Sequence, residues 1–268
     1  MLAAYGIPAA VAAGVTRYVR YRSKNTVAWG VLEGENVRKI TGDLFGTHKV
    51  TGAPVKLSDV KLLAPAEPPK IFAVGLNYRS HLGARPAPGS PEIFYKPVTC
   101  LRDPGEPIVI PKIANNVHYE SEMVLVIGKR TSMVTPAQAT DSIFGVTCGN
   151  DVSERDWQNG EQKDLQWWRA KGADTFGPCG PVLVRGLDYN KLLLQGRLNG
   201  EVVQKQTTSD LLFNPAAIVS YISQAVTLQA GDLVYTGTPG TTKKMKPGDV
   251  FEVELDGVGI LKNPVAAA

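Results

Sequence analysis

The chain has 268 residues, 43% hydrophobic and 20% charged, which excludes a disordered composition and is enough for one large domain or a large and a small one. The net charge of +4 is scattered in short groups and no apolar stretch approaches about 18–20 residues, so we expect neither a nucleic-acid partner nor a membrane span. Cys100, Cys148 and Cys179 are odd in number and far apart, which disfavours a disulfide framework and fits the reducing cytoplasm.

The N-terminal quarter predicts an extension followed by a small domain. Residues 1–14 are apolar and alanine-rich, and we expect a poorly ordered extension. A trimmed export signal stays open, because Ala10-Val11-Ala12 resembles a cleavage site. Residues 15–65 predict a small N-terminal β-domain that begins with a β-meander. The proline-rich connection that follows marks the boundary to a second domain over residues 66–268.

The second domain is expected to be built mainly from short strands. These are expected at 70–76, 92–97, 106–111, 118–128, 143–151, in a hairpin over 194–204, and over much of 232–265. Helices are expected at 135–142, at 152–158 with Ser153 as N-cap, and at 214–226, where Ile218, Tyr221, Ile222 and Ala225 share a face. The glycines and prolines of residues 82–91 predict a surface loop that closes over a site. Because strands outnumber helices and no βαβ rhythm is present, the fold class is α+β, mostly β.

The segment 118–128, HYESEMVLVIG, carries the first chemical signal. Along a strand, side chains alternate between faces, so His118, Glu120 and Glu122 point the same way. The run that follows is apolar and predicts burial, where unpaired carboxylates would be costly. A hard divalent cation would compensate them. The alternative is a half-exposed edge strand with two solvated glutamates.

A third carboxylate, Asp151, ends the predicted strand 143–151. It is either a helix cap or a further oxygen ligand. With Glu120 and Glu122 it would form a set that suits Mg²⁺, Mn²⁺ or Ca²⁺ better than Zn²⁺. His81, just beyond a buried strand at the root of the loop 82–91, is either structural or a catalytic base. The sequence contains no GxSxG, HExxH, GxxxxGK[ST] or GxGxxG motif, so nucleophilic serine or P-loop chemistry has no support.

From residue 70 onwards the sequence resembles the fumarylacetoacetate hydrolase family. The landmarks occur in the family's order: GLNYRSH (75–81), FYKP (94–97), HYESE (118–122), NDVSERDWQ (150–158), KGADTFGP (171–178), LNGEVVQ (198–204) and TGTPG (236–240). The resemblance implies a mixed β-sandwich roll as the catalytic domain, with residues 15–65 as the small N-terminal β-domain of some members. It also implies a homodimer.

The resemblance also implies chemistry on small anionic oxo-acids with one Mg²⁺ or Mn²⁺ per subunit. The metal would be held by Glu120, Glu122 and Asp151, and would bind the oxygens of the oxo-acid and stabilise an enolate. His81 matches the family's general base and Lys171 the lysine that faces the reacting oxygen. The expected substrate contacts are Arg79, Lys96, Gln158 and Thr238.

One departure from the family pattern concerns His81. Hydrolytic members carry a loop glutamate a few residues after this histidine, and the pair activates water. Residues 82–85 contain no acid here, and the nearest loop carboxylate is Glu92. The departure weakens the case for water activation, whereas moving a proton at an enol needs a base but no activated water.

Three hypotheses follow. The first is a metal-dependent hydrolase that cleaves a C–C bond in a diketo acid of the acylpyruvate type, leaving an enolate on the metal. The alternative is an isomerase or tautomerase of unsaturated or keto dioates, or an oxaloacetate decarboxylase, with the same metal site. The third is a metal-binding β-domain without turnover. The substrate is not specified by the sequence.

Overall fold

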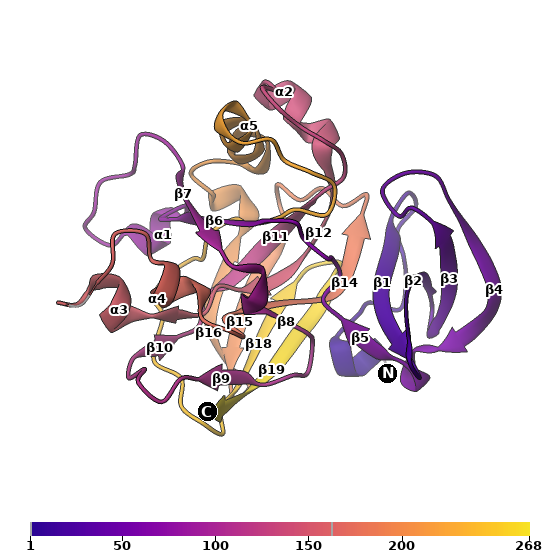
Figure 1. Ribbon diagram of the computed structural model, residues 1–268, viewed down its shortest axis with the longest axis horizontal. Coiled ribbons are helices and arrows are strands. Elements are labelled where there is room, and N and C mark those ends of the chain that lie inside the picture. The colour runs from indigo at the N-terminus through magenta and orange to yellow at the C-terminus, as the bar shows by residue number, and fades with distance from the viewer. Residues whose placement is uncertain (1, 162) are drawn as a thin grey trace.

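The computed structural model of the chain describes residues 2–161 and 163–268. Within this part, most strands belong to one mixed sheet that runs from the N-terminal meander into the larger domain (Figure 1). Its main path has the order β4-β3-β2-β1-β14-β12-β11-β17-β6-β7, with β5 paired to β1 and β8 to β14. The strands are β1 (Thr16–Ser23), β2 (Thr26–Glu33), β3 (Asn36–Gly42), β4 (His48–Lys56), β5 (Lys61–Leu63), β6 (Ile71–Gly75), β7 (Glu92–Lys96), β8 (Leu101–Arg102), β11 (Ser121–Ile127), β12 (Ile143–Asn150), β14 (Gly177–Arg185) and β17 (Leu233–Tyr235).

A second sheet packs on β11, β12 and β14 and completes the sandwich. Its strands are β9 (Ile108–Ile110), β15 (Leu193–Leu198), β16 (Glu201–Thr207), β18 (Val250–Leu255) and β19 (Gly259–Ala267). A two-stranded ribbon joins β10 (Val117–His118) to β13 (Ser153–Glu154). The α+β, mostly-β fold class predicted from the sequence is confirmed.

Strand β11 is buried along its whole length because both faces are covered. Met123 and Leu125 belong to the apolar cluster that includes Phe251 and Val253 of the second sheet. Val124 belongs to a separate cluster on the opposite face, with Tyr235 and Leu183. A strand covered on both sides needs a continuous apolar run rather than an alternating one, and this explains the MVLVI sequence.

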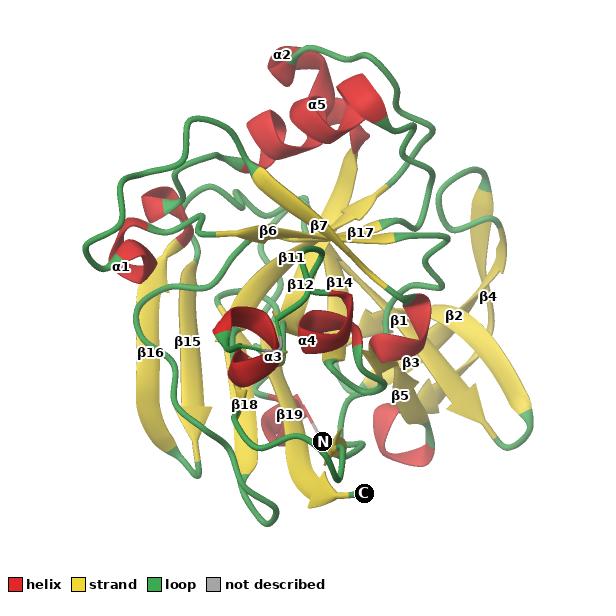
Figure 2. Cartoon of the chain, turned by 60° about the vertical axis from the view of Figure 1, so that its left-hand side comes forward, coloured by secondary structure: helices red, strands yellow, loops and turns green. Residues whose placement is uncertain are grey.

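The helices are short and lie around the sandwich (Figure 2). They are α1 (Arg79–Leu82), α2 (Pro136–Ala139), α3 (Arg155–Asn159), α4 (Trp168–Gly172) and α5 (Pro215–Ala225), with 3₁₀ turns at Leu2–Tyr5, Leu57–Asp59, Val98–Cys100, Thr140–Ser142 and Thr208–Asp210. In α5 the Asn214 side chain caps the backbone N–H of Ala217. Its buried face contains Ile218 and Ile222 as expected, but Tyr221 is exposed.

At the start of the chain two apolar side chains are buried and residues 8–14 are exposed, and the poor order expected for residues 1–14 stays a prediction. Leu2 and Ile7 are buried in the main apolar cluster. The Arg17 guanidinium donates hydrogen bonds to the carbonyl oxygens of Pro8 and Ala10. Removing the apolar side chains of Leu2 and Ile7 from water favours this placement.

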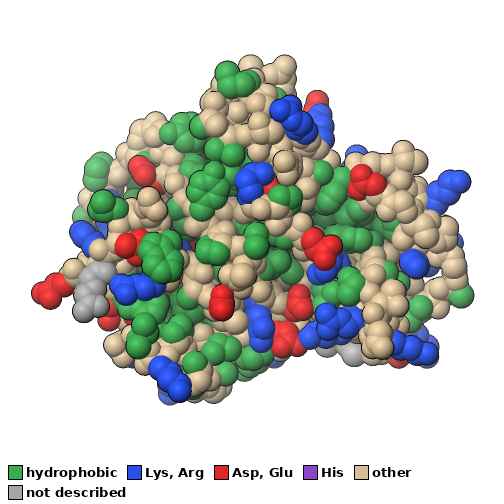
Figure 3. All heavy atoms as spheres, viewed as in Figure 1, with side chains coloured by type: hydrophobic (Ala, Val, Ile, Leu, Met, Phe, Trp, Pro, Cys, Tyr) green, Lys and Arg blue, Asp and Glu red, His purple; other side chains and the backbone are tan. Residues whose placement is uncertain are grey.

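On the face shown in Figure 3, acidic and basic side chains are interspersed with apolar ones. None of the helices in the described ranges combines the length and the apolar character needed to cross a membrane.

Candidate active site

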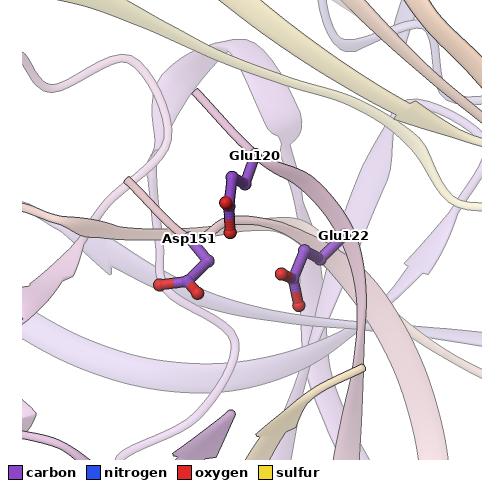
Figure 4. Close-up of side chains that lie close together, drawn as sticks. All are labelled: Glu120, Glu122 and Asp151. Carbon is purple, nitrogen blue, oxygen red and sulfur yellow. The ribbon is translucent and has the colours of Figure 1, made fainter. Parts of the chain in front are cut away.

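The three carboxylates singled out in the sequence come together in one buried cluster (Figure 4). One oxygen each of Glu120, Glu122 and Asp151 lies within 4.8 Å of the others. The reason is the register of two adjacent antiparallel strands, in which Ser121 at the start of β11 pairs with Asn150 at the end of β12. Residues that flank this pair therefore meet at one edge of the sheet.

The expected continuous strand over 118–128 is broken at Tyr119 and Glu120, which lie between β10 and β11. Local hydrogen bonds hold Glu120 there: its N–H donates to Asn150 Oδ1 (2.8 Å), and its carbonyl accepts from the N–H of Asp151 (2.9 Å). Glu122 instead lies within β11, and its Oε2 accepts from the N–H of Gly237 (2.7 Å).

Two lysines donate to the carboxylates. Lys171 Nζ lies 2.6 Å from Glu120 Oε2 and 2.7 Å from Asp151 Oδ2. Lys96 Nζ lies 2.6 Å from Asp151 Oδ1, donates to the Lys171 carbonyl, and has a fully buried side chain. Buried ionic groups need such complete pairing.

Arg155 forms the third positive contact. Its Nη2 donates to Glu120 Oε1 and to Thr242 Oγ1 (2.9 Å), and its Nη1 donates to Gln158 Oε1 (2.6 Å). We predicted no role for this arginine, although it lies inside the NDVSERDWQ segment that matches the family.

The carboxylates differ in their electrostatics. Burial alone would raise the pKa of Glu120, but Lys171 and Arg155 outweigh it and hold that pKa below its usual range. Burial, followed by the charges of Asp151 and Glu120, raises the pKa of Glu122 well above its ordinary value. Within the described ranges no cation contacts Glu122. A dication would supply the positive charge that Glu122 lacks. Carboxylate oxygens are ligands that suit Mg²⁺ or Mn²⁺, so the residues fit the expected metal.

Beside the cluster is a cavity of 470 Å³ that combines polar and apolar walls. Of the residues predicted to serve the site, it is lined by His81, Glu120, Gln158, Lys171 and Thr238. Further lining residues with polar side chains include Ser80, Arg85, His118, Arg155 and Thr242.

Two expected substrate contacts are placed elsewhere. Arg79 is exposed at the start of α1 and does not line the cavity. Lys96 is buried behind Asp151 and does not line it either. Burial favours deprotonation of Lys96, but Asp151 outweighs this effect and raises its pKa. Lys96 therefore pairs with Asp151, and its predicted contact with the substrate stays a prediction.

His81 contacts a backbone carbonyl, whereas hydrolytic family members pair this histidine with a loop glutamate. Its Nδ1 contacts the carbonyl oxygen of Gly240, and the Ser80 hydroxyl accepts from the Gly240 N–H (3.1 Å). Glu92, the candidate acidic partner, is exposed and lines a different cavity, beside Trp167 and Trp168.

His118 faces the cavity but is not grouped with the carboxylates. Its Nδ1 lies 2.9 Å from Thr242 Oγ1 and its Nε2 lies 2.8 Å from Asn116 Oδ1. Asn116 donates through Nδ2 to Asp156 (2.8 Å), so its Oδ1 accepts from His118 Nε2. In the neutral ring Nδ1 is then the acceptor, and the Thr242 hydroxyl gives its proton to it. Burial, followed by the nearby Arg155 charge, lowers the pKa of His118 to about 4.

Two family models match the chain. One described as "Fumarylacetoacetate (FAA) hydrolase C-terminal" matches residues 70–266, and one described as "Rv2993c-like, N-terminal" matches residues 16–65. The first covers well over half of the sequence, so the chain belongs to the fumarylacetoacetate hydrolase family, an enzyme superfamily.

Several named proteins align with most of the chain. Protein Rv2993c of Mycobacterium tuberculosis is 43% identical over 262 residues, covering 93% of this chain and 97% of that protein. Oxaloacetate tautomerase fahd2, mitochondrial, of Xenopus laevis is 38% identical over 221 residues, covering 78% and 69% respectively. A crystal structure of 2-hydroxyhepta-2,4-diene-1,7-dioate isomerase from Mycobacterium marinum aligns with a TM-score of 0.87 and 41% identity, covering 94% of this chain and 98% of that one.

Proposed function

We propose that this protein is a divalent-cation-dependent isomerase or tautomerase of a small dicarboxylic oxo-acid. This replaces the C–C hydrolase that we expected first. The support is the activity named for two relatives, an oxaloacetate tautomerase and a heptadienedioate isomerase. In the part of the chain that the structure describes, no carboxylate hydrogen-bonds to His81, which agrees with the proposal because proton transfer at an enol consumes no water.

The observation that carries the proposal is the charge balance of the site. The three clustered carboxylates, when ionised, contribute −3, and the cations that contact them, Lys96, Lys171 and Arg155, contribute +3. A bound dication would leave a surplus of +2. A dianion such as oxaloacetate would neutralise this surplus, whereas a monocarboxylate would not. Arg85, on the cavity wall outside the cluster, brings the surplus to +3, which favours a dianion over a monoanion further.

Glu120, Glu122 and Asp151 are the residues that would hold Mg²⁺ or Mn²⁺. When bound, such a cation supplies a Lewis acid that stabilises negative charge on the keto or enol oxygen of the substrate. Lys171 lies on the cavity wall, and its ammonium group is 2.6 Å from Glu120 Oε2, beside the oxygens that would hold the cation. Its positive charge would stabilise the developing oxyanion.

His81 is the residue that would move the proton. Because a carbonyl can only accept, the contact with Gly240 assigns the hydrogen to Nδ1 and leaves the lone pair on Nε2. In the keto-to-enol direction Nε2 of the neutral imidazole would take a proton from the carbon beside the ketone, and the imidazolium formed would then deliver a proton to the enolate oxygen. The enol-to-keto direction would run the same two transfers in reverse. Tautomerisation then needs one base and releases no fragment.

The test is a product analysis with Mg²⁺. We expect accelerated loss of the enol absorbance of oxaloacetate, with one unchanged carbon skeleton by NMR. Release of CO₂ would identify a decarboxylase, and cleavage of an acylpyruvate into two acids would restore the hydrolase hypothesis. Either outcome, without accelerated tautomerisation, would refute the proposal.

A further inference from the structure

Gln204 forms hydrogen bonds both to Ser121, which lies between the two glutamates, and to the loop that contains Thr238. It lies on β16, in the second sheet, and is buried with an exposed fraction of 3%. Its Oε1 accepts from the N–H of Ser121, the residue between Glu120 and Glu122 (3.0 Å). Its Nε2 donates to Thr238 Oγ1 (2.9 Å) and to the carbonyl of Pro239 (2.6 Å).

The two backbone partners fix the orientation of this amide. The Ser121 N–H can only donate and the Pro239 carbonyl can only accept, so the oxygen and nitrogen of Gln204 cannot be exchanged. Both amide hydrogens are used, one on Pro239 and the other on the Thr238 hydroxyl. Gln204 is therefore a fixed donor to Thr238.

A hydroxyl that accepts a hydrogen bond on one side directs its own proton elsewhere. Thr238 lines the cavity, and no group in the described ranges accepts its proton. On the same loop, Thr242 gives its proton to His118 and so has none left for the cavity. The two threonines therefore present opposite hydrogen-bonding characters to a ligand.

We propose that Gln204 is a positioning residue that turns the Thr238 hydroxyl into an obligate donor toward an anionic oxygen of the substrate. The inference rests on the proposed function only for the identity of that anion. Gln204 does not line the cavity, so it acts through Thr238 rather than by touching substrate.

The experiment is a double-mutant cycle on ligand binding that requires no turnover. In Gln204→Glu the carboxylate still accepts from Ser121 but cannot donate, so Thr238 would give its proton to it instead. We expect the dissociation constant for oxalate, titrated at saturating Mg²⁺, to rise about tenfold or more. In a Thr238→Val background the same change should have no further effect, within about twofold.

Controls separate this role from charge and packing. Gln206→Glu makes the same chemical change on the same strand. The new carboxylate can still accept the hydrogen bond that the Thr207 N–H donates to Gln206, so oxalate affinity should stay unchanged. Gln204→Met removes the donor without adding a charge or a strong acceptor, so the Thr238 hydroxyl loses its orientation but keeps its proton. It should weaken oxalate binding less than Gln204→Glu does, and only when Thr238 is present, and it serves if Gln204→Glu does not fold. Thermal midpoints check folding.

Equal losses in the wild-type and Thr238→Val backgrounds would overturn the proposal, since they would indicate charge or packing. Unchanged oxalate affinity in Gln204→Glu alone would also overturn the proposal. So would a wild-type protein that does not bind oxalate with Mg²⁺. A protein that binds oxalate as expected but does not tautomerise oxaloacetate would refute only the proposed function.

Discussion

The Nδ1 atom of His81 contacts the carbonyl oxygen of Gly240, which lies 159 residues away in the sequence. The same short segment supplies the N–H of Gly237 to Glu122 and the hydroxyl of Thr242 to Arg155. One loop therefore contacts the candidate base, a candidate metal ligand and an arginine that lines the cavity. A carbonyl fixes the tautomer of His81 without the charge that an acidic partner would add.

The first prediction concerns the candidate base. His81→Ala should lower kcat for enol–keto interconversion by at least about tenfold, because a positioned base typically contributes about 10²–10⁴-fold. Mg²⁺ affinity should stay nearly unchanged, since His81 is not among the clustered carboxylates. Glu92→Ala is the control and should have little effect on kcat, because Glu92 lines another cavity. Steady-state kinetics and Mg²⁺ titration check both variants, and an unchanged kcat in His81→Ala would rule out this base.

The second prediction concerns metal binding by Glu122. Ligand carboxylates must be ionised, and the pKa of Glu122 is raised by burial and by Asp151 and Glu120. Mg²⁺ affinity should therefore increase as pH rises through that pKa, with proton release in calorimetry. Glu122→Gln should abolish Mg²⁺ binding and activity together. Full activity of this variant with Mg²⁺ would show that the cluster is not the metal site.

The same shift predicts how the metal-free protein responds to pH. A carboxyl with a raised pKa binds its proton more tightly in the folded than in the unfolded state. Its stabilising contribution is present below the unfolded pKa of about 4.3 and is lost as pH rises through the folded pKa. With EDTA present, Glu122→Gln should not show this decrease in the free energy of unfolding with rising pH. It should therefore be more stable than the wild type near neutral pH. A lower thermal midpoint for the variant would contradict the direction of the shift.

The third prediction concerns His118, whose pKa is lowered to about 4. The folded state favours the neutral ring, so its stabilising contribution is present above the unfolded pKa of about 6.5 and is lost as pH falls through about 4. His118→Gln should lack this part of the acid destabilisation. Urea unfolding of both proteins between pH 7 and pH 4 measures it, and parallel pH profiles would contradict the prediction.

The fold class and the cluster of three carboxylates were predictable because they depend on local patterns. The apolar run 123–127 predicts a buried strand, and carboxylates at the ends of neighbouring strands meet once those strands pair. Glu120, Glu122 and Asp151 were therefore identified from spacing and from the resemblance to the family. The break in the strand at Glu120 was missed because it depends on the side chain of Asn150, which lies 30 residues further along.

The cationic residues were harder to assign because sequence does not show which side of a carboxylate a cation approaches. Lys96 and Lys171 both contact Asp151, but only Lys171 reaches the cavity. Arg79 begins α1 and Arg85 lies in the loop after that helix, and only Arg85 lines the cavity. The partner of His81 is a backbone carbonyl, which no residue type in the sequence could have indicated.

The last prediction concerns Arg85 and the choice of a dicarboxylic substrate. Arg85 lies in the loop after α1, follows the positive-φ residue Gly83, and lines the cavity with no ion-pair partner among the described residues. It is the positive group available for the substrate carboxylate that lies farther from the metal. Arg85→Gln should raise KM for oxaloacetate about tenfold, the effect of losing a charged hydrogen bond, with a smaller change in kcat.

The matched control is Arg79→Gln, which removes the same charge from the same segment; both arginines are exposed, but Arg79 does not line the cavity. It should leave KM nearly unchanged. A monocarboxylic probe gives the second comparison: Mg²⁺-dependent exchange of the pyruvate methyl protons, followed by NMR, should be equally fast in the wild type and in Arg85→Gln. If Arg85→Gln slowed pyruvate exchange as much as it weakened oxaloacetate binding, Arg85 would support the site as a whole and would not select the second carboxylate.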